Sequence, residues 1–149
     1  MTTYDIHRRQ WVAHPLDKVF DYFYRAENLE QLTPPFLRFH ITQAPPRMEA
    51  GARIEYKLRV RGLPLHWLTI IEKWDPPHEF VDIQAKGPYK LWHHTHHFRA
   101  ENGGTTIEDS IRYALPFGPL GRLVNRLMVA RDVAMIFDYR EQKVREIFP

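Results

Sequence analysis

The stretch Arg53-Ile54-Glu55-Tyr56-Lys57-Leu58-Arg59-Val60-Arg61 alternates charged and apolar residues from end to end. Successive side chains of a β-strand point to opposite faces, so the apolar residues from Ile54 to Val60 share one face and only charged residues occupy the other. This pattern is typical of an antiparallel sheet that is buried on one side. The apolar face is most simply part of the core, and the lining of a pocket is the alternative.

Extended segments continue on both sides of this strand, and turns rich in proline or glycine separate them. Each segment is short and bounded by such turn residues, which predicts further strands. Gly87-Pro88 and Asn102-Gly103-Gly104 supply two of the hairpin turns. The predicted strands are Thr2–Ala13, Leu37–Gln43, Leu63–Trp74, Glu79–Ala85, Tyr89–Arg99 and Thr105–Leu115.

Two short helices are predicted between the first two strands. Pro15 suits the first turn of a helix, and the apolar residues from Leu16 to Phe23 follow at spacings of three and four, which gives one buried face. A second helix covers Glu27–Leu32 and ends at Thr33-Pro34-Pro35. Two helices this short cannot form a core alone, so we expect them to cover another element.

The hydrophobic period changes from two to 3.6 after Pro116-Phe117-Gly118-Pro119. The apolar residues that follow form a broad stripe on a predicted helix of ~28 residues, roughly 40 Å long, and Arg140 and most other basic residues fall off it. Such a helix can dock on a membrane, but acidic residues interrupt its positive face, which favours packing on the sheet. The stripe consists of Leu120, Leu123, Val124, Leu127, Ala130, Ala134, Phe137, Val144 and Phe148.

The order of these elements predicts an α+β fold in a single domain over residues 1–149. A curved antiparallel sheet of about seven strands has one face to bury, and the long C-terminal helix is the element that can cover it. A curved sheet and a helix do not close tightly everywhere. The gap between them is expected to form a ligand cavity.

Composition excludes several classes of protein. The chain has no cysteine, so disulfides, thiolate nucleophiles and cysteine-ligated metal centres are excluded. Neither a signal peptide nor a run of about 18 apolar residues is present, so we expect a cytoplasmic protein without membrane insertion. The net charge is +3 with acids and bases interspersed, and a nucleic-acid partner is not expected.

The hairpin around Asn102-Gly103 places four pairs of residues opposite one another. Its apolar members identify the inward face, because side chains of one strand alternate between faces. Two imidazoles, a carboxylate and a phenol then share that face. The pairs are Trp92–Tyr113, His94–Ile111, His96–Asp109 and Phe98–Ile107.

Two interpretations of this inward face involve no catalysis. In the first, His96 and Asp109 form a buried cross-strand pair, and Asp82, Gln84 or water satisfies His94. In the second, the polar groups orient a ligand whose apolar body contacts the aromatic rings. The candidate ligand-binding residues are Tyr56, Trp67, Phe80, Asp82, Gln84, Trp92, His94, His96, Asp109, Tyr113 and Phe137.

A third interpretation is catalytic. A carboxylate beside a histidine fixes its tautomer and raises its basicity, so His96 with Asp109 could remove a proton next to a carbonyl group. Tyr113 or Tyr56 would donate to the resulting oxyanion. His94 and His96 also share a strand face and could hold a metal ion with Asp109 or Asp82, although this spacing is common by chance.

A set of residues from Trp67 to Arg140 carries a resemblance to a known family: Trp67, Trp74-Asp75-Pro76-Pro77, Phe80, Asp82, Gln84, Gly87-Pro88-Tyr89, Trp92, His94, His96, Phe98, Asp109, Tyr113, Leu115-Pro116 and Ile136-Phe137-Asp138-Tyr139-Arg140. With these residues the chain resembles the SRPBCC (START / Bet v 1-like) superfamily, and most closely its polyketide cyclase/dehydrase-like branch. The resemblance implies a helix-grip fold with an internal cavity for a small hydrophobic molecule. The oxygenase branch is not supported, because it requires an iron-binding pattern and a Rieske partner, and this chain has no cysteine.

The function expected on this basis is binding of a small hydrophobic or aromatic molecule between the sheet and the C-terminal helix. The alternative is a cofactor-free polyketide cyclase or dehydratase that uses a His-Asp pair, and a pocketless interaction domain is a third. We expect no cofactor, and the protein is expected to be a monomer or a homodimer.

Overall fold

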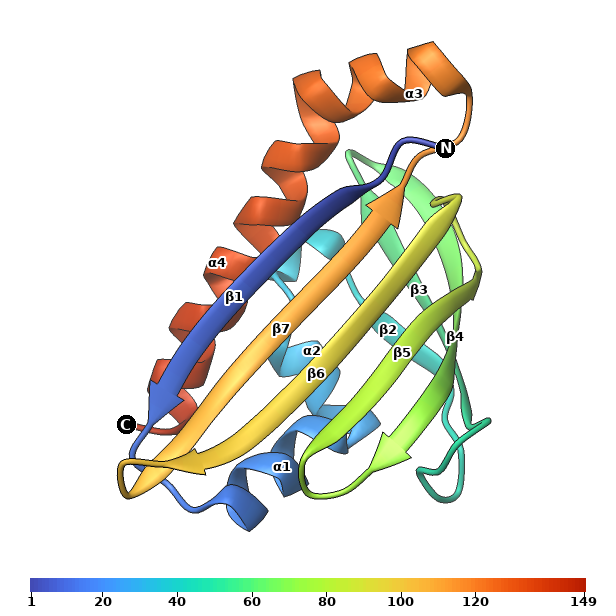
Figure 1. Ribbon diagram of the computed structural model, residues 1–149. Coiled ribbons are helices and arrows are strands. Elements are labelled where there is room, and N and C mark those ends of the chain that lie inside the picture. Colours follow the sequence, from blue (N-terminus) through green and yellow to red (C-terminus); the bar gives the residue numbers. More distant parts are fainter.

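A computed structural model describes residues 1–149 and contains one antiparallel sheet of seven strands in the order β1-β7-β6-β5-β4-β3-β2 (Figure 1). The sheet, the C-terminal helix and the short helices after the first strand form the predicted helix-grip fold. The strands are β1 Tyr4–Val12, β2 His40–Gln43, β3 Arg53–Val60, β4 Leu63–Asp75, β5 Glu79–Lys86, β6 Leu91–Glu101 and β7 Gly104–Ala114.

The predicted strands and the hairpin register are confirmed, with β1 and β2 shorter than expected. All four predicted β6–β7 pairs occur, from Trp92 opposite Tyr113 to Phe98 opposite Ile107. Asn102 and Gly103 both have positive φ, as a tight hairpin turn requires. The strand predicted from Leu37 begins only at His40, because a 3₁₀ turn, η2 Pro35–Leu37, follows the prolines.

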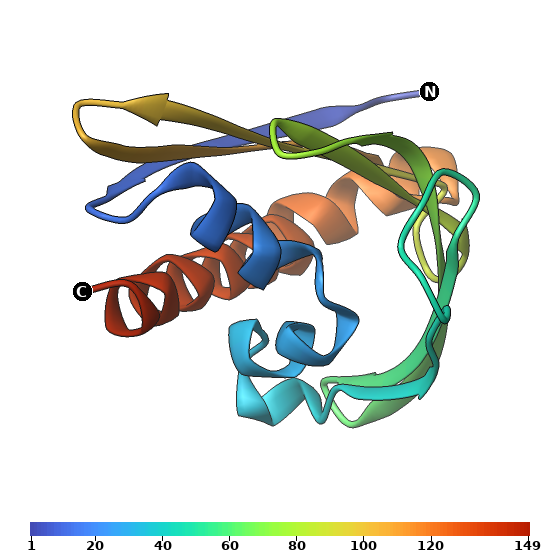
Figure 2. The same ribbon diagram turned by 90° about the horizontal axis from the view of Figure 1, so that it is seen from below.

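The sheet is strongly curved. Seen from below, β1, β7 and β6 form one wall, and β4, β3 and β2 turn away from it to form a second wall around the helices (Figure 2). The β4–β5 register shifts between Leu68 and Thr69 and again between Ile71 and Lys73. Such β-bulges bend a strand and increase its twist, which explains why the sheet curves here.

The short helices lie on the concave side of the sheet. Residues Val19, Phe20 and Phe23 of the first helix are buried as predicted, and they pack with Phe98 of β6 and Phe148 at the C-terminus. This cluster fills one end of the fold and leaves the middle of the concave side open. The elements are α1 Leu16–Tyr24, η1 Ala26–Asn28 and α2 Leu29–Leu32.

The C-terminal helical run covers 30 residues and contains a π-helical turn. That turn contains Asn125, which is buried and accepts a hydrogen bond from the Tyr113 hydroxyl at 2.7 Å. No helix of the protein is long and apolar enough to cross a membrane. The parts of the run are α3 Gly118–Val124, η3 Asn125–Val129 and α4 Ala130–Ile147.

The predicted apolar stripe of this helix is wrong at its start, and it omits two buried residues of α4, Val133 and Arg140. Leu120, Leu123 and Leu127 are exposed, because α3 and η3 extend past the end of the sheet (Figure 1). Within this run, only α4 lies against the concave face of the sheet (Figure 1). Arg140, predicted to lie off the stripe, is 9% exposed. It follows Phe137 by three residues, so the two side chains share one side of the helix.

Candidate ligand cavity and buried ionic network

A cavity of about 300 Å³ lies between the sheet and α4, and 23 of its 30 lining residues are hydrophobic. The apolar face of β3, from Ile54 to Val60, lines this cavity. The alternative, the lining of a pocket, therefore describes this strand, because the curved sheet carries it away from α4, and Ile54 is also a buried core residue. Trp67, Trp92 and Phe137 also line the cavity.

Both buried histidines are hydrogen-bonded to carboxylates, but not in the predicted pairing. His94 Nε2 lies 2.8 Å from Asp109 Oδ1, and His96 Nε2 lies 2.5 Å from Asp82 Oδ2. The predicted partners, His96 and Asp109, are directly opposite in the strand register, yet His96 Nδ1 is 3.5 Å from Asp109. Each imidazole instead reaches a diagonal neighbour, which is within range of a long side chain.

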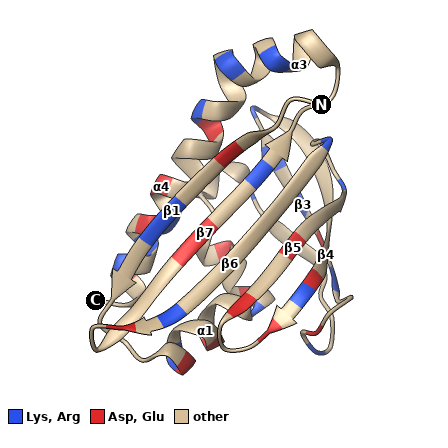
Figure 3. Cartoon of the chain, viewed as in Figure 1, with Lys and Arg blue, Asp and Glu red and all other residues tan.

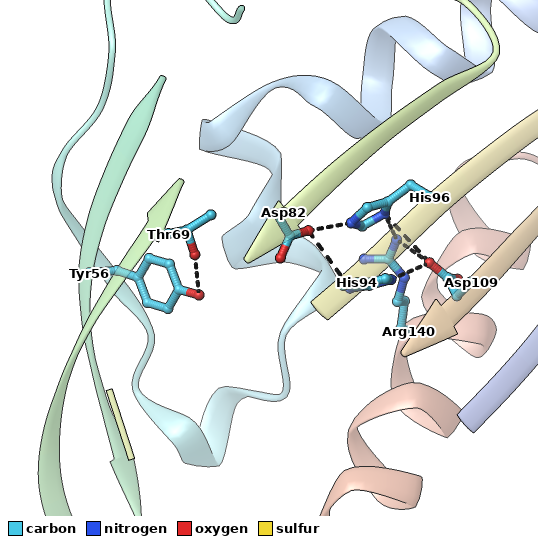
Figure 4. A network of polar contacts seen from close by, with 7 residues as sticks. All are labelled: Tyr56, Thr69, Asp82, His94, His96, Asp109 and Arg140. Carbon is cyan, nitrogen blue, oxygen red and sulfur yellow. Dashed lines mark hydrogen bonds and ion pairs between the residues drawn. The ribbon is translucent and has the colours of Figure 1, made fainter. Parts of the chain in front are cut away.

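Arg140 completes this network from α4 (Figure 4). Its Nη2 lies 3.3 Å from Asp109 Oδ1 and 3.4 Å from His96 Nδ1, and its guanidinium lies over the ring of Phe23. Arg140 was not among the predicted site residues. The signal in the sequence that could have identified it was its spacing of three and four residues from Phe137 and Val144, which places it on the buried side of the helix.

The contacts define the protonation of His96. Its Nε2–H donates to Asp82, and its Nδ1 accepts from Arg140, so the ring is a neutral imidazole. Burial, together with the nearby His94, lowers the pKa of His96 to about 4, although the two carboxylates oppose this shift. The ring therefore stays neutral at physiological pH.

Both carboxylates remain ionised despite their burial. Burial alone would raise the pKa of Asp82, but His94, His96 and the Arg140 guanidinium outweigh it and lower the pKa. For Asp109, Arg140 and the hydrogen bond from His94 likewise outweigh burial and hold the pKa well below its usual value. The network therefore holds two carboxylates and one guanidinium beside the cavity, with His96 neutral.

A second polar pair belongs to the opposite part of the sheet, on β3 and β4 (Figure 4). The hydroxyls of Tyr56 and Thr69 are 3.2 Å apart, and both residues line the cavity. Burial raises the pKa of Tyr56, so its phenol keeps its proton. Beside it, Trp67 stacks on the Tyr56 ring with centroids 5.9 Å apart, and its buried Nε1 has no hydrogen-bond partner.

Three of the predicted ligand-binding residues do not line the cavity. The Gln84 side chain makes two hydrogen bonds to the backbone of Tyr89, at 2.7 and 3.0 Å. The Tyr113 hydroxyl is bonded to Asn125 and so is not placed to donate to an oxyanion in the cavity. Asp109 does not line the cavity itself but contacts three residues that do, His94, His96 and Arg140. The predicted residues that do line it are Tyr56, Trp67, Phe80, Asp82, Trp92, His94, His96 and Phe137.

The network also contains a candidate ligand set for a metal ion. One ligand atom each from Asp82, His94 and His96 lies within 4.8 Å of the others. However, the Arg140 guanidinium lies 3.4 Å from His96 Nδ1, and its positive charge opposes a cation at this position. Both ring nitrogens of His96 are already hydrogen-bonded, so the arrangement fits a hydrogen-bonded network better than a metal centre.

Comparison with known proteins gives one family and many similar folds. The family model described as "Polyketide cyclase / dehydrase and lipid transport" matches residues 12–136. No curated protein matches the chain by sequence.

Three solved structures illustrate the similarity of fold. The protein TTHA0849 from Thermus thermophilus is 20% identical with a TM-score of 0.68, over 98% of this chain and 100% of that chain. CV1439 from Chromobacterium violaceum is 10% identical with a TM-score of 0.74, over 97% of this chain and 96% of that one. A point mutant of a Thalictrum norcoclaurine synthase, in complex with a transition-state analogue, is 17% identical with a TM-score of 0.66, over 97% and 96% of the two chains.

Proposed function

The chain belongs to the polyketide cyclase / dehydrase and lipid transport family, and on that premise we propose that it binds a small aromatic molecule in the internal cavity. The observation that carries the proposal is the composition of the cavity wall. Most of the wall is apolar and aromatic, while a few polar groups converge from β5, β6 and α4. Cavities of this size and composition are typical of sites for small organic ligands.

The charges at the polar wall favour a ligand that donates a hydrogen bond. The Asp82 carboxylate lies on the cavity wall, and the network around it holds two carboxylates against one guanidinium. A phenol, an alcohol or an amine would direct its donor to this wall. The aromatic body would then contact Trp67 and Trp92, whose rings lie edge to face with centroids 5.5 Å apart.

A matched pair of ligands tests this preference. Both 2-naphthol and 2-methoxynaphthalene present the same aromatic body, but only the naphthol has a hydrogen to donate. We expect the naphthol to raise the melting temperature more, because a ligand that binds only the native state stabilises it. Replacing Asp82 with Ala should abolish the difference. If neither compound changes the melting temperature and native mass spectrometry finds no retained organic molecule, the proposed function is wrong.

A cavity-filling variant provides a second, independent test. Leu58 lines the cavity from β3, whereas the neighbouring Lys57 is exposed on the other face. Leu58→Trp should reduce naphthol binding, since the indole would occupy the space of the ligand, and Lys57→Trp should leave it unchanged. Equal binding by both variants would place the ligand elsewhere.

The second candidate is general base catalysis, and the geometry favours His94 over the predicted His96. Both ring nitrogens of His96 are engaged, by Asp82 and Arg140. His94 donates Nε2–H to Asp109, so its neutral form has an acceptor at Nδ1, 3.8 Å from Asp82. An orienting carboxylate of this kind fixes the tautomer of the catalytic imidazole.

This candidate is tested by proton exchange rather than by an unknown natural reaction. The protein is incubated with α-tetralone in D₂O, and exchange of the hydrogens next to the carbonyl is followed by NMR. Catalysis by His94 predicts exchange above the buffer rate that is lost in His94→Gln while tetralone binding persists. Exchange at the buffer rate with saturating tetralone would exclude this role toward enolisable ketones.

A further inference from the structure

The start of the C-terminal helix presents apolar side chains to solvent. Leu120, Leu123 and Leu127 are 59%, 50% and 66% exposed. Spacings of three and four residues place them on one side of the helix. The buried residues of the same turns are Gly121 and Asn125. The leucines therefore point away from the protein, and no other part of the chain covers them.

Two further exposed apolar residues belong to segments that are joined to this part of the helix, one through the chain and one through an ion pair. Phe117 is 78% exposed and has a φ of 71°, in a region that bulky residues rarely adopt. Leu63, the first residue of β4, is 67% exposed, and two hydrogen bonds from Arg61 in the preceding turn to Asp132 link that turn to the helix. The leucine patch is defined here as Leu63, Phe117, Leu120, Leu123 and Leu127.

All charged side chains in the helical part of the leucine patch are basic. Arg122 and Arg126 are exposed and lie one turn apart on the same stretch of helix. The chain has no acidic residue from Ile111 to Arg131. Figure 3 shows basic but no acidic residues on α3. Acidic residues interrupt the positive charge only from Asp132 onward.

Each segment of the leucine patch has neighbours in the sequence that line the cavity. Leu115 and Val129 line the cavity and flank the helical part of the patch. Val60 and Leu65 line it on either side of Leu63. Residues adjacent to the leucine patch in the chain therefore belong to the cavity wall.

From this combination we propose that the leucine patch docks on an anionic lipid surface. Exposed apolar side chains beside arginines are the pattern by which an amphipathic helix lies in the headgroup region. A second copy of the chain is a poorer fit, because a symmetric dimer would bring the arginines of both copies together. The proposal does not depend on which ligand the cavity holds.

Vesicle co-sedimentation tests the proposal without any ligand. We expect the protein to bind vesicles of phosphatidylcholine and phosphatidylglycerol, to bind phosphatidylcholine alone more weakly, and to be released by salt. Leu123→Asp/Leu127→Asp should weaken binding at least about tenfold, since each leucine transfers several methylene groups out of water. Arg122→Gln/Arg126→Gln should weaken it by roughly 25-fold, because each arginine near an anionic surface contributes about fivefold.

Matched controls make these changes specific. Phe36→Asp removes an exposed apolar side chain outside the leucine patch, and Arg53→Gln/Lys57→Gln removes two exposed positive charges from the outer face of β3. Both should bind vesicles like the wild type. Absence of wild-type binding, or equal loss in variants and controls, would overturn the proposal. So would a wild-type dimer that the leucine substitutions convert to monomers, because the patch would then be a contact between copies.

Discussion

Replacing Arg140 with methionine removes a buried guanidinium from the Asp109 carboxylate while keeping most of the apolar stem. Both side chains are only 10% exposed, and their closest polar atoms are 3.3 Å apart. At an effective dielectric constant of about 20, two charges about 4 Å apart attract by about 4 kcal/mol. Removing one partner of a buried ion pair costs about 3–5 kcal/mol. His94 still donates to Asp109 in the variant, so we expect a loss near the lower limit, about 3 kcal/mol.

A double-mutant cycle separates this attraction from the loss of packing. Arg140→Met, Asp109→Asn and the combined variant are unfolded in urea at neutral pH, and their free energies of unfolding are compared. The combined variant should lose about 2 kcal/mol less than the sum of the single variants, because it leaves no unpaired charge. Arg145→Met, whose side chain is 59% exposed and pairs with Glu141, should cost less than about 0.5 kcal/mol.

Two outcomes would refute the reasoning. Additive losses would mean that Arg140 and Asp109 do not interact in solution. A cost below about 1 kcal/mol for Arg140→Met would mean that water reaches the carboxylate, so that the network is not buried as described.

Buried groups and close contacts elsewhere in the protein supply three more predictions. The depressed pKa of His96 (about 4) means that the native state binds fewer protons than the unfolded chain, so the stability is complete above about pH 6.5 and falls toward pH 4. Urea unfolding should therefore show a loss of about 2 kcal/mol between about pH 7.5 and 5. This loss should be absent in His96→Gln and retained in the partly exposed control His97→Gln. Tyr113→Phe should cost about 1 kcal/mol by leaving Asn125 unpaired, yet leave naphthol affinity unchanged in calorimetry. Gly121→Ala should lower thermal stability by about 1–3 kcal/mol, because its Cβ would lie 2.1 Å from a backbone carbonyl oxygen; an unchanged melting temperature would contradict this close packing.

The parts of the fold that depend on local periodicity were predictable. The alternation from Arg53 to Arg61 identified β3, and the Asn102-Gly103 turn determined every predicted pair of the β6–β7 hairpin. Both signals depend on neighbouring residues and on the regular alternation of side chains along a strand. The switch to a period of 3.6 likewise located the C-terminal helix, although not the π turn within it.

The partners within the network were not predictable by the same means. Register placed His96 opposite Asp109, but the rotamers of two stacked imidazoles, with centroids 3.7 Å apart, direct each ring to a diagonal carboxylate. Arg140 was predicted to lie off the buried stripe. Its burial was not predictable, because a buried arginine requires a carboxylate from another element, and helical spacing alone does not reveal that partner. The exposed leucines were missed for a related reason: amphipathic spacing does not reveal where the sheet ends.

The two proposals together give the cavity two different ends, one with the buried charged groups and one toward the leucine patch. Arg140 lies about 20 Å along the helix from Leu127, given the rise of about 1.5 Å per residue. The buried charges therefore stand far from the leucine patch, and the wall between them is mostly apolar. A molecule entering from a lipid surface would carry its polar group inward first and leave its apolar body toward the patch. Binding and docking would then have separate residues, so Asp82→Ala should impair naphthol binding without changing vesicle binding, and Leu123→Asp/Leu127→Asp should do the reverse.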